Sequence, residues 1–303
     1  MNSTSKALRN SIITVGSFDG IHKGHQSIIR SLVTAAHKTQ KQAIVFTFFP
    51  NPTVFLRKIN SPYYLTTQEE KNNLLKDLGV DHIITLTFNE ALSQTEPEKF
   101  IQDIFNQNNF ESIFIGHDFR FGIGRKGDVQ TLNQLSAELG FSVCIQKPVS
   151  KNNVVISSTH IRELISQGDV KQAALLLGRS YSIQGKVVHG DGRGKKIGLP
   201  TANIQIWPQK LLPIQGVYAA NVTIEGNKYS GIVNIGVRPT FYKKRVKQAT
   251  EVHVLDFDEQ IYDCDIKLEF IQFLRPENKY ENAQALMLQI QKDIQQTREI
   301  IKA

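Results

Sequence analysis

The period of the hydrophobic pattern changes near residue 180, and this change limits the possible folds more than any other feature of the chain. Before it, short β-type apolar runs alternate with helical patterns, which is typical of a parallel sheet with crossover helices. After it, apolar and polar residues alternate with period two, and hairpin turns replace the helices. The sequence therefore predicts two domains of different architecture, residues 1–180 and 181–303.

The first domain is predicted to contain five strands with helices between them. The expected strands are residues 11–15, 43–48, 82–87, 112–115 and 142–146. A first helix ends near Thr39, further helices span 67–78, 97–106 and 128–139, and short helices at 158–166 and 169–177 follow the last strand. A loop is expected at the prolines of residues 50–52. This order predicts a doubly wound α/β sheet.

The second domain is predicted to be a small antiparallel β-barrel followed by one helix. The expected strands are residues 218–224, 230–237, 251–258 and 265–274. The first two are joined by a hairpin turn at Glu225, Gly226 and Asn227. A helix from Glu281 to about Lys302 is expected to end the chain.

Composition and charge exclude several other classes of protein. Of the 303 residues, 40% are hydrophobic and 21% are charged, which fits neither disordered nor fibrous chains. The net charge of +8 suits anionic ligands such as nucleotides but is too small to indicate nucleic acid. Cys144 and Cys264 are the only cysteines, so a disulfide framework and a CxxC metal site are excluded. Without an apolar run of ~18 residues, we expect a cytoplasmic protein with neither signal peptide nor membrane partner.

The first candidate site is GSFDGIHKGHQ, residues 16–26, at the carboxyl end of the first strand. Doubly wound sheets bind ligands at this edge. Gly16 and Gly20 allow the backbone to turn tightly and approach a phosphate, while amides of the following helix supply donors. His22 and His25 share one helix face and can both donate to a polyphosphate. An isolated HxxH is more often a pair of surface histidines, and zinc is disfavoured because no third ligand stands nearby.

Two further segments bring polar residues to the same edge of the sheet. The glycine-rich loop GHDFRFGIGRKGD follows the fourth strand and contains Asp118, Arg120, Arg125 and Lys126. ISSTHIRELI offers helix-capping residues at Ser157, Ser158 and Thr159, with Arg162 in the first turn. A cation there opposes the helix dipole, and a bound anion would offset this. A capped helix with a solvated arginine is the commoner meaning of one such motif, but three such loops meet at one edge.

These three motifs together resemble a known family. In the order GxFDGxHxGH, GxDFRFGxxRxGD and ISSTxIR, over residues 11–170, they are similar to the FMN adenylyltransferase module of bacterial bifunctional riboflavin kinase/FAD synthetases. That module belongs to the HxGH nucleotidyltransferases. The resemblance implies an N-terminal doubly wound HxGH nucleotidyltransferase domain that converts FMN to FAD with ATP.

The resemblance also implies roles for individual residues. His22 and His25 would bind the ATP phosphates and act in catalysis, and the nucleotide would also be bound by Gly16, Phe18, Asp19, Gly20, Ser158, Thr159 and Arg162. The flavin end is expected at Asn51, Asp118 and Arg120. The family usually has Asn in place of Ser17 and His in place of Asn51. Both residues can form hydrogen bonds, so altered affinity rather than lost activity is expected.

The second domain carries a basic, glycine-rich loop of its own. GKVVHGDGRGKKIGLPTANIQI, residues 185–206, contains Gly190, Gly192, Gly194 and Gly198. Thr201 and Asn203 are two apart and lie on one face of an extended strand, where two hard oxygen ligands can meet Mg²⁺ carrying ATP phosphates. Taken alone, such a loop is more often only a mobile connection.

Four later segments make a second resemblance specific. GVYAA, NIGVRPTF, EVHVLDFD and LRPENKY occur in the order of the riboflavin kinase module of the same family. This implies a six-stranded flavokinase barrel in which Thr201 and Asn203 bind metal and nucleotide, Glu251 is the catalytic base and Arg275 lies near the flavin. Gly190, Gly194, Lys195 and Gly198 would bind nucleotide. Lys195 stands where the family commonly has Arg, and Asp263 where it usually has Gly.

The leading hypothesis is one enzyme with two ATP-dependent steps, riboflavin to FMN and FMN to FAD, that uses Mg²⁺ with ATP. One alternative is that only one activity is retained, because the motifs depart from the family at Ser17, Asn51, Lys195 and Asp263. Another is a flavin-responsive RNA-binding regulator, supported only by the basic run YKKRVK at 242–247. A solvated hairpin loop is the better explanation of that run. The sequence indicates no oligomeric state.

Overall fold

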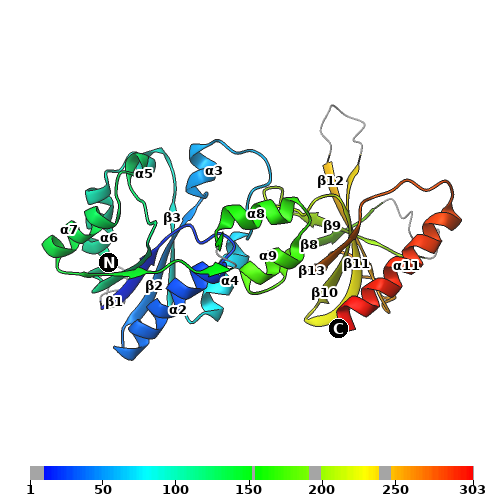
Figure 1. The fold of residues 1–303 in the computed structure, drawn as a ribbon, viewed down its shortest axis with the longest axis horizontal. Coiled ribbons are helices and arrows are strands. Elements are labelled where there is room, and N and C mark those ends of the chain that lie inside the picture. Colours follow the sequence, from blue (N-terminus) through cyan, green and yellow to red (C-terminus); the bar gives the residue numbers. More distant parts are fainter. Residues whose placement is uncertain (1–9, 152–153, 191–198, 239–246, 303) are drawn as a thin grey trace. The chain divides into compact units, whose positions relative to one another are not determined.

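The structure, a computed structural model, describes residues 10–151, 154–190, 199–238 and 247–302. The chain divides into two compact units after Ser158, and each is described by itself. Figure 1 shows the sheet of the first unit and the barrel of the second. Within these described ranges, no helix combines the length and the apolar character needed to cross a membrane.

The first unit is built on a fully parallel sheet of five strands (Figure 1). In spatial order they are β3 (His82–Thr87), β2 (Gln42–Phe49), β1 (Ser11–Val15), β4 (Ser112–Gly116) and β5 (Ser142–Gln146). The chain builds outward from β1 to β3 and then returns to β4 on the other side of β1. The loops after β1 and β4 therefore leave the sheet at the point where such sheets bind ligands. The doubly wound prediction is confirmed, and each strand lies within one residue of its expected bounds.

Helices cover both faces of this sheet, with α6 (Pro97–Asn108) and α7 (Val129–Leu139) on one face and α2 (Lys23–Lys38) and α4 (Gln68–Asp77) on the other. Successive residues of a strand point to opposite faces. Ile13 and Val15 of β1 consequently join the core under α6 and α7, whereas Ile12 joins the core under α2 and α4.

Several short elements of the first unit are missing from the sequence prediction. α3 (Pro52–Leu56) replaces the loop expected at residues 50–52, α5 (Glu90–Ser93) precedes α6, and β6 (Ser150–Lys151) pairs with β7 (Val154–Val155). Helices of one turn are too short to show a hydrophobic period. Asn51 nevertheless defines the start of α3, because its Oδ1 accepts the backbone N–H of Thr53 at 2.9 Å.

The second unit begins with two helices, α8 (Ser158–Ser166) and α9 (Val170–Leu177). α9 packs against the first and last strands of the barrel, β8 (Tyr181–Val188) and β13 (Asp265–Arg275). The division of the chain after Ser158 groups nearly all of α8 and the whole of α9 with the barrel, so the boundary between the compact units lies earlier in the chain than the change of period at 180.

The barrel is closed and antiparallel. In spatial order its strands are β10 (Gly216–Ile224), β11 (Asn227–Arg238), β12 (Lys247–Val254), β9 (Ala202–Ile206), β8 and β13, and β13 pairs back with β10. Glu225 and Gly226 join β10 to β11 with φ angles of 47° and 84°. Two successive left-handed residues are what a tight hairpin turn requires. The predicted barrel and its predicted turn are both confirmed.

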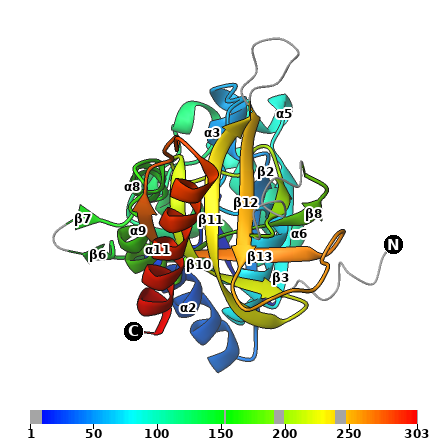
Figure 2. The ribbon, with the colours of Figure 1, turned by 90° about the vertical axis from the view of Figure 1, so that its right-hand side faces the viewer.

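The C-terminal helix α11 (Ala283–Lys302) lies across β10 and β11 on the outside of the barrel (Figure 2). A buried ion pair holds it there. Arg275, at the end of β13, donates bonds of 2.8–3.1 Å to the Asp293 carboxylate, which also accepts the side-chain amide of Gln289. The Asp293 side chain is only 3% exposed.

Replacing Asp293 with Ala is expected to destabilise the protein by about 3 kcal/mol, because it leaves the Arg275 guanidinium buried without its anion. Urea denaturation followed by circular dichroism measures this. Arg298→Ala is the matched control, because Arg298 pairs with Asp256 in an exposed ion pair on the same helix and should matter little. Equal effects of the two substitutions would contradict the prediction.

Candidate active sites

The turn after β1 is held in a strained conformation. Phe18 and Ile21 have positive φ angles of 47° and 41°, which bulky residues rarely adopt. Each costs of order 1 kcal/mol or more relative to ordinary backbone. Both side chains are buried, and Gly20 takes a third left-handed position at φ 83° where no side chain interferes. Hydrophobic burial therefore offsets the strain and keeps the turn in one conformation.

A buried carboxylate ties this turn to the segment before α4. Asp19 accepts bonds of 3.1 Å from the backbone N–H groups of Leu65 and Thr66 and from the Thr66 hydroxyl. The backbone N–H of Gly20 donates to the same hydroxyl at 3.2 Å. Asp19, expected at the nucleotide, thus directs its carboxylate to donors within the protein and shapes the turn.

Two histidines project from the turn and from the helix that follows it. His22 caps α2, because its Nδ1 accepts the backbone N–H of His25 at 3.3 Å. A ring nitrogen that accepts this bond carries no proton, so the proton of neutral His22 is on Nε2. The two imidazole rings stack with centroids 3.6 Å apart, and the Phe18 and His25 rings meet edge to face. The structure therefore brings together the two histidines that the motif predicts.

Two glycines of this motif make room for rings. A Cβ at Gly24 would lie 3.0 Å from Cε1 of His22, so glycine lets the imidazole fold back over the helix. Gly24 is not among the residues expected at this site, although its place between the two histidines is a signal that could have revealed it. A Cβ at Gly16 would lie 2.9 Å from the Phe18 ring. Gly16 thus makes room for this ring, while Gly20 provides the predicted tight turn.

A buried lysine lies under the same turn, and no motif points to it. Lys71, in the first turn of α4, is only 6% exposed. Its ammonium donates to the Thr47 hydroxyl at 2.9 Å and to the carbonyls of Ser17 at 3.4 Å and Phe48 at 3.5 Å. Burial lowers the pKa of Lys71 to about 8, while the negative charge of Asp19 acts in the opposite direction.

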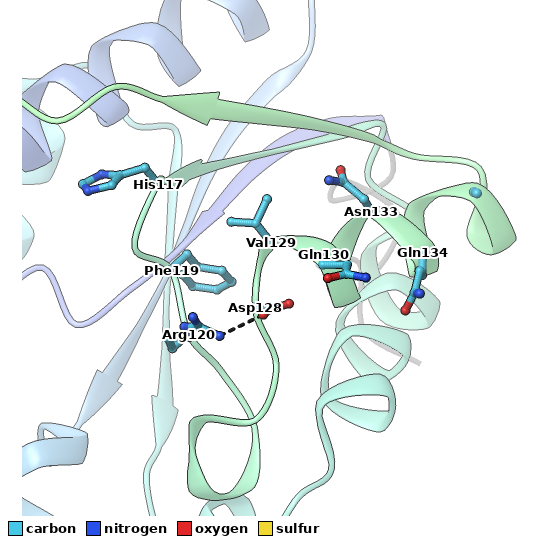
Figure 3. Close-up of a pocket in the computed structure, with 9 residues that line it drawn as sticks. His117, Phe119, Arg120, Asp128, Val129, Gln130, Asn133 and Gln134 are labelled. Carbon is cyan, nitrogen blue, oxygen red and sulfur yellow. Dashed lines mark hydrogen bonds and ion pairs between the residues drawn. The ribbon is translucent and has the colours of Figure 1, made fainter.

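The loop after β4 presents Asp118 and Arg120 in different ways. Asp118 is exposed, whereas Arg120 forms an ion pair of 2.9 Å with Asp128, which caps α7. The Thr131 backbone N–H, with a smaller contribution from Arg120, lowers the pKa of Asp128. An open cavity of about 760 Å³ lies between this loop and α7. Figure 3 shows the residues that line it, with His117, Phe119 and Arg120 on the loop side.

A continuous series of aromatic rings connects this loop with α3. Neighbouring ring centroids are 5.2–6.3 Å apart along Phe119, Phe121, Phe100, Phe48, Phe88 and Phe55. Asn51 is buried at the start of α3, with its Oδ1 in the helix cap. The residues expected at the flavin are therefore found near the two ends of this aromatic series.

The third motif is divided between the two units. The Ser158 hydroxyl donates to the Asp19 carbonyl at 2.9 Å, which ties this serine to the strained turn. Thr159 and Arg162 belong to the second unit, where Thr159 is exposed and Arg162 is half-buried.

In the second unit, a row of polar residues crosses three neighbouring strands. Asn203 of β9 lies directly opposite Glu251 of β12, which lies directly opposite Asn234 of β11. Directly opposite residues point to the same face of an antiparallel sheet. Because Val252 and Val233, the next residues on these strands, are buried inside the barrel, the row faces its outside.

Close backbone approaches shape the ends of this polar row. A Cβ at Gly190 would overlap the Asn203 amide, so only glycine allows the backbone at residue 190 to lie directly against that side chain. A Cβ at Gly236 would lie 2.6 Å from Oε1 of Glu277, and this oxygen accepts the Asn234 amide at 2.9 Å. Glu277 is thus a further acidic residue beside the row. It belongs to the segment LRPENKY but is not among the residues expected at the site.

The other residues predicted for the second domain either lie outside this polar row or fall outside the described residues. Thr201 is exposed just before β9, and Arg275 is directed to Asp293 with its guanidinium also over the Tyr280 ring. Asp263, where the family usually has glycine, adopts the left-handed conformation at φ 63°. Gly192, Gly194, Lys195, Gly198 and residues 242–246 of the basic run lie outside the described residues.

Comparison with known proteins matches both parts of the chain. The family model described as FAD synthetase matches residues 4–160, and the family model described as riboflavin kinase matches residues 177–301. Together the two matches cover nearly the whole sequence.

Curated relatives named bifunctional riboflavin kinase/FMN adenylyltransferase are similar over almost their full length. One from Buchnera aphidicola subsp. Acyrthosiphon pisum (strain APS) is 37% identical, covering 94% of this chain and 91% of the relative. One from Bacillus subtilis (strain 168) is 36% identical with the same coverage, 94% and 91%. One from Escherichia coli (strain K12) is 34% identical, covering 93% and 90%.

A solved structure from Streptococcus pneumoniae, described as a macrolide-efflux protein, has a TM-score of 0.87 and 31% identity. The match covers 96% of this chain and 94% of that one. This likeness concerns the fold, since the description of that protein names another activity than the curated relatives do.

The buried ammonium of Lys71 is expected to make stability depend on pH. Its pKa of about 8 in the folded protein lies below its ordinary value of 10.5, so unfolding takes up a proton between these pH values and stability rises with pH. The difference corresponds to about 3 kcal/mol. Relative to Lys71→Met, the wild-type free energy of unfolding should therefore rise by up to this amount between pH 7 and pH 10.5.

Urea denaturation at several pH values, followed by far-UV circular dichroism, measures this difference. Lys76→Met is the matched control, because Lys76 is an exposed lysine on the same helix. The difference in free energy of unfolding between Lys76→Met and wild type should not change with pH. The prediction is wrong if the difference between Lys71→Met and wild type is also independent of pH.

Proposed function

This chain belongs to the bifunctional riboflavin kinase/FMN adenylyltransferase family, and from this premise we propose which of its residues perform the two reactions. The enzyme phosphorylates riboflavin to FMN and adenylylates FMN to FAD, both with ATP. The proposed division assigns adenylylation to residues 1–180 and phosphorylation to residues 181–303. The observation that carries it is the presence of separate polar clusters, one at the carboxyl edge of the sheet and one on the barrel.

In adenylylation, an oxygen of the FMN phosphate attacks the α-phosphorus of ATP and pyrophosphate leaves. Charge builds up on the leaving pyrophosphate, so donors that are already in position accelerate the step. We assign this role to His22 and His25. Their support is geometric, because the two rings stack at the start of α2, in the turn that follows β1. By the family resemblance, Ser158, Thr159 and Arg162 bind the triphosphate.

Four residues of the strained turn, Gly16, Phe18, Asp19 and Gly20, are proposed to form the nucleotide cradle. Their support is structural, because burial and the Asp19 network hold the turn in one conformation. Because such a preformed site does not need to reorganise when ATP binds, no binding energy is lost in ordering the turn, and more of it can stabilise the transition state.

The flavin of FMN is proposed to bind between Asn51 and Arg120, against the half-buried rings at the ends of the aromatic series, whose middle rings belong to the core. Aromatic faces stack well on planar heterocycles, and the cavity beside Arg120 is open to ligand. Asp118 and Arg120 add charged groups at that end. At the other end, the Asn51 cap occupies Oδ1 and leaves Nδ2 to donate to the flavin.

In phosphorylation, the terminal ribityl hydroxyl of riboflavin attacks the γ-phosphorus of ATP and ADP leaves. Glu251 is the proposed base that takes the hydroxyl proton, a contribution of typically ~10²- to 10⁴-fold. Its position between Asn203 and Asn234 supports this, because two neutral amides flank the carboxylate. Arg275 is proposed near the flavin, and the phosphates are assigned to Gly190, Gly194, Lys195 and Gly198.

Mg²⁺ is the proposed metal of the kinase reaction, with Thr201 and Asn203 as its protein ligands. In the described part of the chain, no three His, Cys, Asp or Glu side chains gather to hold a metal by themselves. Two neutral oxygen ligands suit Mg²⁺, which keeps several waters and binds largely through substrate phosphates. When bound with ATP, it neutralises charge on the phosphates.

We place the enzyme in the cytoplasm, because Cys144 and Cys264 are free thiols and thiols persist in a reducing compartment. Its proposed partners are its substrates and products, namely ATP, riboflavin, FMN and FAD. Neither nucleic acid nor membrane is part of the proposal.

Two parallel incubations test the assignment of both activities. The full-length chain is given ATP and Mg²⁺ with either riboflavin or FMN, and the flavins are separated by chromatography. Both FMN and FAD are expected. FMN without FAD would show that only phosphorylation is retained, FAD formed only from added FMN would show that only adenylylation is retained, and unreacted riboflavin and FMN would refute the proposal.

Glu251→Gln is expected to lower the rate of riboflavin phosphorylation by at least ~10²-fold, because it keeps the size of the side chain but removes the base. Adenylylation of added FMN should persist near the wild-type rate. Glu259→Gln, an exposed change beyond the same strand, is the control and should leave both rates unchanged. Phosphorylation by Glu251→Gln within a few-fold of wild type would remove Glu251 from the mechanism.

His25→Ala is expected to lower adenylylation by roughly 10²-fold or more, the usual effect of removing one donor to a developing anion. Riboflavin phosphorylation by the same protein should remain. His37→Ala is the matched control, because His37 is a half-exposed histidine at the other end of α2. Comparable losses in both reactions would contradict the separate assignment of the two sites.

A further inference from the structure

Lys71 is a buried cation in an unfavourable position. It lies in the first turn of α4, where the helix dipole disfavours a positive charge. Burial adds the cost of removing an ammonium from water. Among the described residues, no carboxylate forms an ion pair with it, and its bonds go to neutral oxygens. We therefore expect the role of this lysine to lie in the hydrogen bonds of its ammonium, which an apolar residue at the same position could not form.

The ammonium connects the ends of two strands. Ser17 follows β1, whereas Thr47 and Phe48 belong to the end of β2. Because an ammonium only donates, the Thr47 hydroxyl accepts a hydrogen bond from it and donates its own O–H to the Ser17 carbonyl at 3.2 Å. Two donors thus hold this carbonyl, immediately before the strained residue Phe18.

We propose that Lys71 is a positioning residue for FMN adenylylation, whose ammonium holds the Ser17 carbonyl and so fixes the turn that presents His22 and His25. This inference rests on the proposed role of that turn in adenylylation. A neutral amine has two N–H donors and a lone pair, so loss of one proton leaves one of the three acceptors without its bond. The charged form is therefore the one that fixes the turn.

The titratable groups around this network behave differently as pH rises. Lys71 loses its charge near its pKa of about 8. Burial raises the pKa of Tyr64, which is next to Asp19, above 10.0, so Tyr64 stays neutral below that pH. Asp19 faces the lysine from the turn, and its carboxylate accepts from Leu65 and Thr66. Glu70, on the same helix, is engaged by the backbone N–H of Thr67.

Activity and stability should consequently respond to pH in opposite directions. Deprotonation of Lys71 relieves the cost of the buried charge, so the unit becomes more stable above pH 8. The same deprotonation loosens the turn, so adenylylation slows. If Lys71 only supported folding, adenylylation would not fall in the range where stability rises.

The experiment compares full-length wild type, Lys71→Met, Lys71→Arg and the exposed control Lys76→Met from pH 6.5 to 9.5. The turnover number and the KM values for FMN and ATP are measured, with riboflavin phosphorylation as the internal reference. Lys71→Met should lower the adenylylation turnover number by about 10²-fold, with smaller changes in KM, because the histidines lose their alignment. Phosphorylation should stay within about two-fold of wild type.

The pH profile separates positioning from simple support of the fold. Wild-type adenylylation should decline as pH rises through about 8, the pKa of Lys71. Lys71→Arg should retain most activity and lose this decline, because arginine keeps its charge throughout the range. Lys76→Met should behave as wild type.

Two results would overturn the inference: wild-type adenylylation kinetics in Lys71→Met, or persistence of the decline near pH 8 in Lys71→Arg. Should Lys71→Met fail to fold by circular dichroism, the profiles of wild type and Lys71→Arg still decide. Absence of FAD from wild type at every pH would refute the proposed adenylylation itself, and the positioning role with it.

Discussion

The turn between β1 and α2 can present two stacked histidines only because buried contacts offset the strain in its backbone. Asp19 fixes one side of the turn to the segment before α4, and Lys71 fixes the other side to the end of β2. Both charged groups bond to neutral partners, and both connections lead to α4 or the residues just before it. The position of this one helix against the sheet therefore sets the geometry of the loop at which the chain reverses its strand order.

The barrel positions its polar residues by a different principle, the register between strands. Asn203, Glu251 and Asn234 become neighbours because three antiparallel strands are paired at those residues. A slip of one residue between strands would turn Glu251 into the apolar interior and Val252 outward. The hydrophobic alternation that builds the barrel core thus also determines on which face the acidic side chain stands. No strained backbone is needed for this arrangement.

The sequence predicts those parts of the protein that depend on neighbours along the chain. Strand positions, the turn at Glu225 and Gly226, and the pairing of His22 with His25 all follow from local spacing. Lys71 and Ser17 are 54 positions apart, and Asn234 and Glu277 are 43 apart, so no local pattern joins them.

The glycines of the loop after β4 illustrate the same limit. They are predicted to form a ligand-binding loop, yet a Cβ at Gly122 or Gly127 would lie 2.6 Å or 2.7 Å from Pro97, at the start of α6. These glycines therefore allow close packing between two segments of the fold. A glycine in a sequence shows that close approach is possible, and only the three-dimensional contact shows whether a ligand or the protein itself makes that approach.

Three of the four departures from the family pattern, Ser17, Asn51 and Asp263, fall where the structural role does not depend on the usual side chain. Ser17 contributes its backbone carbonyl to Lys71 and Thr47, so a change from asparagine leaves that contact intact. Asn51 starts α3 with a side-chain cap that its carboxamide forms readily. Asp263 replaces glycine at φ 63°, a conformation that aspartate tolerates better than most residues, and its backbone N–H still donates to Val187 at 3.0 Å. At these three positions the substitutions preserve the hydrogen bonds and backbone conformations on which the two clusters depend, which favours retention of both activities over the loss of one.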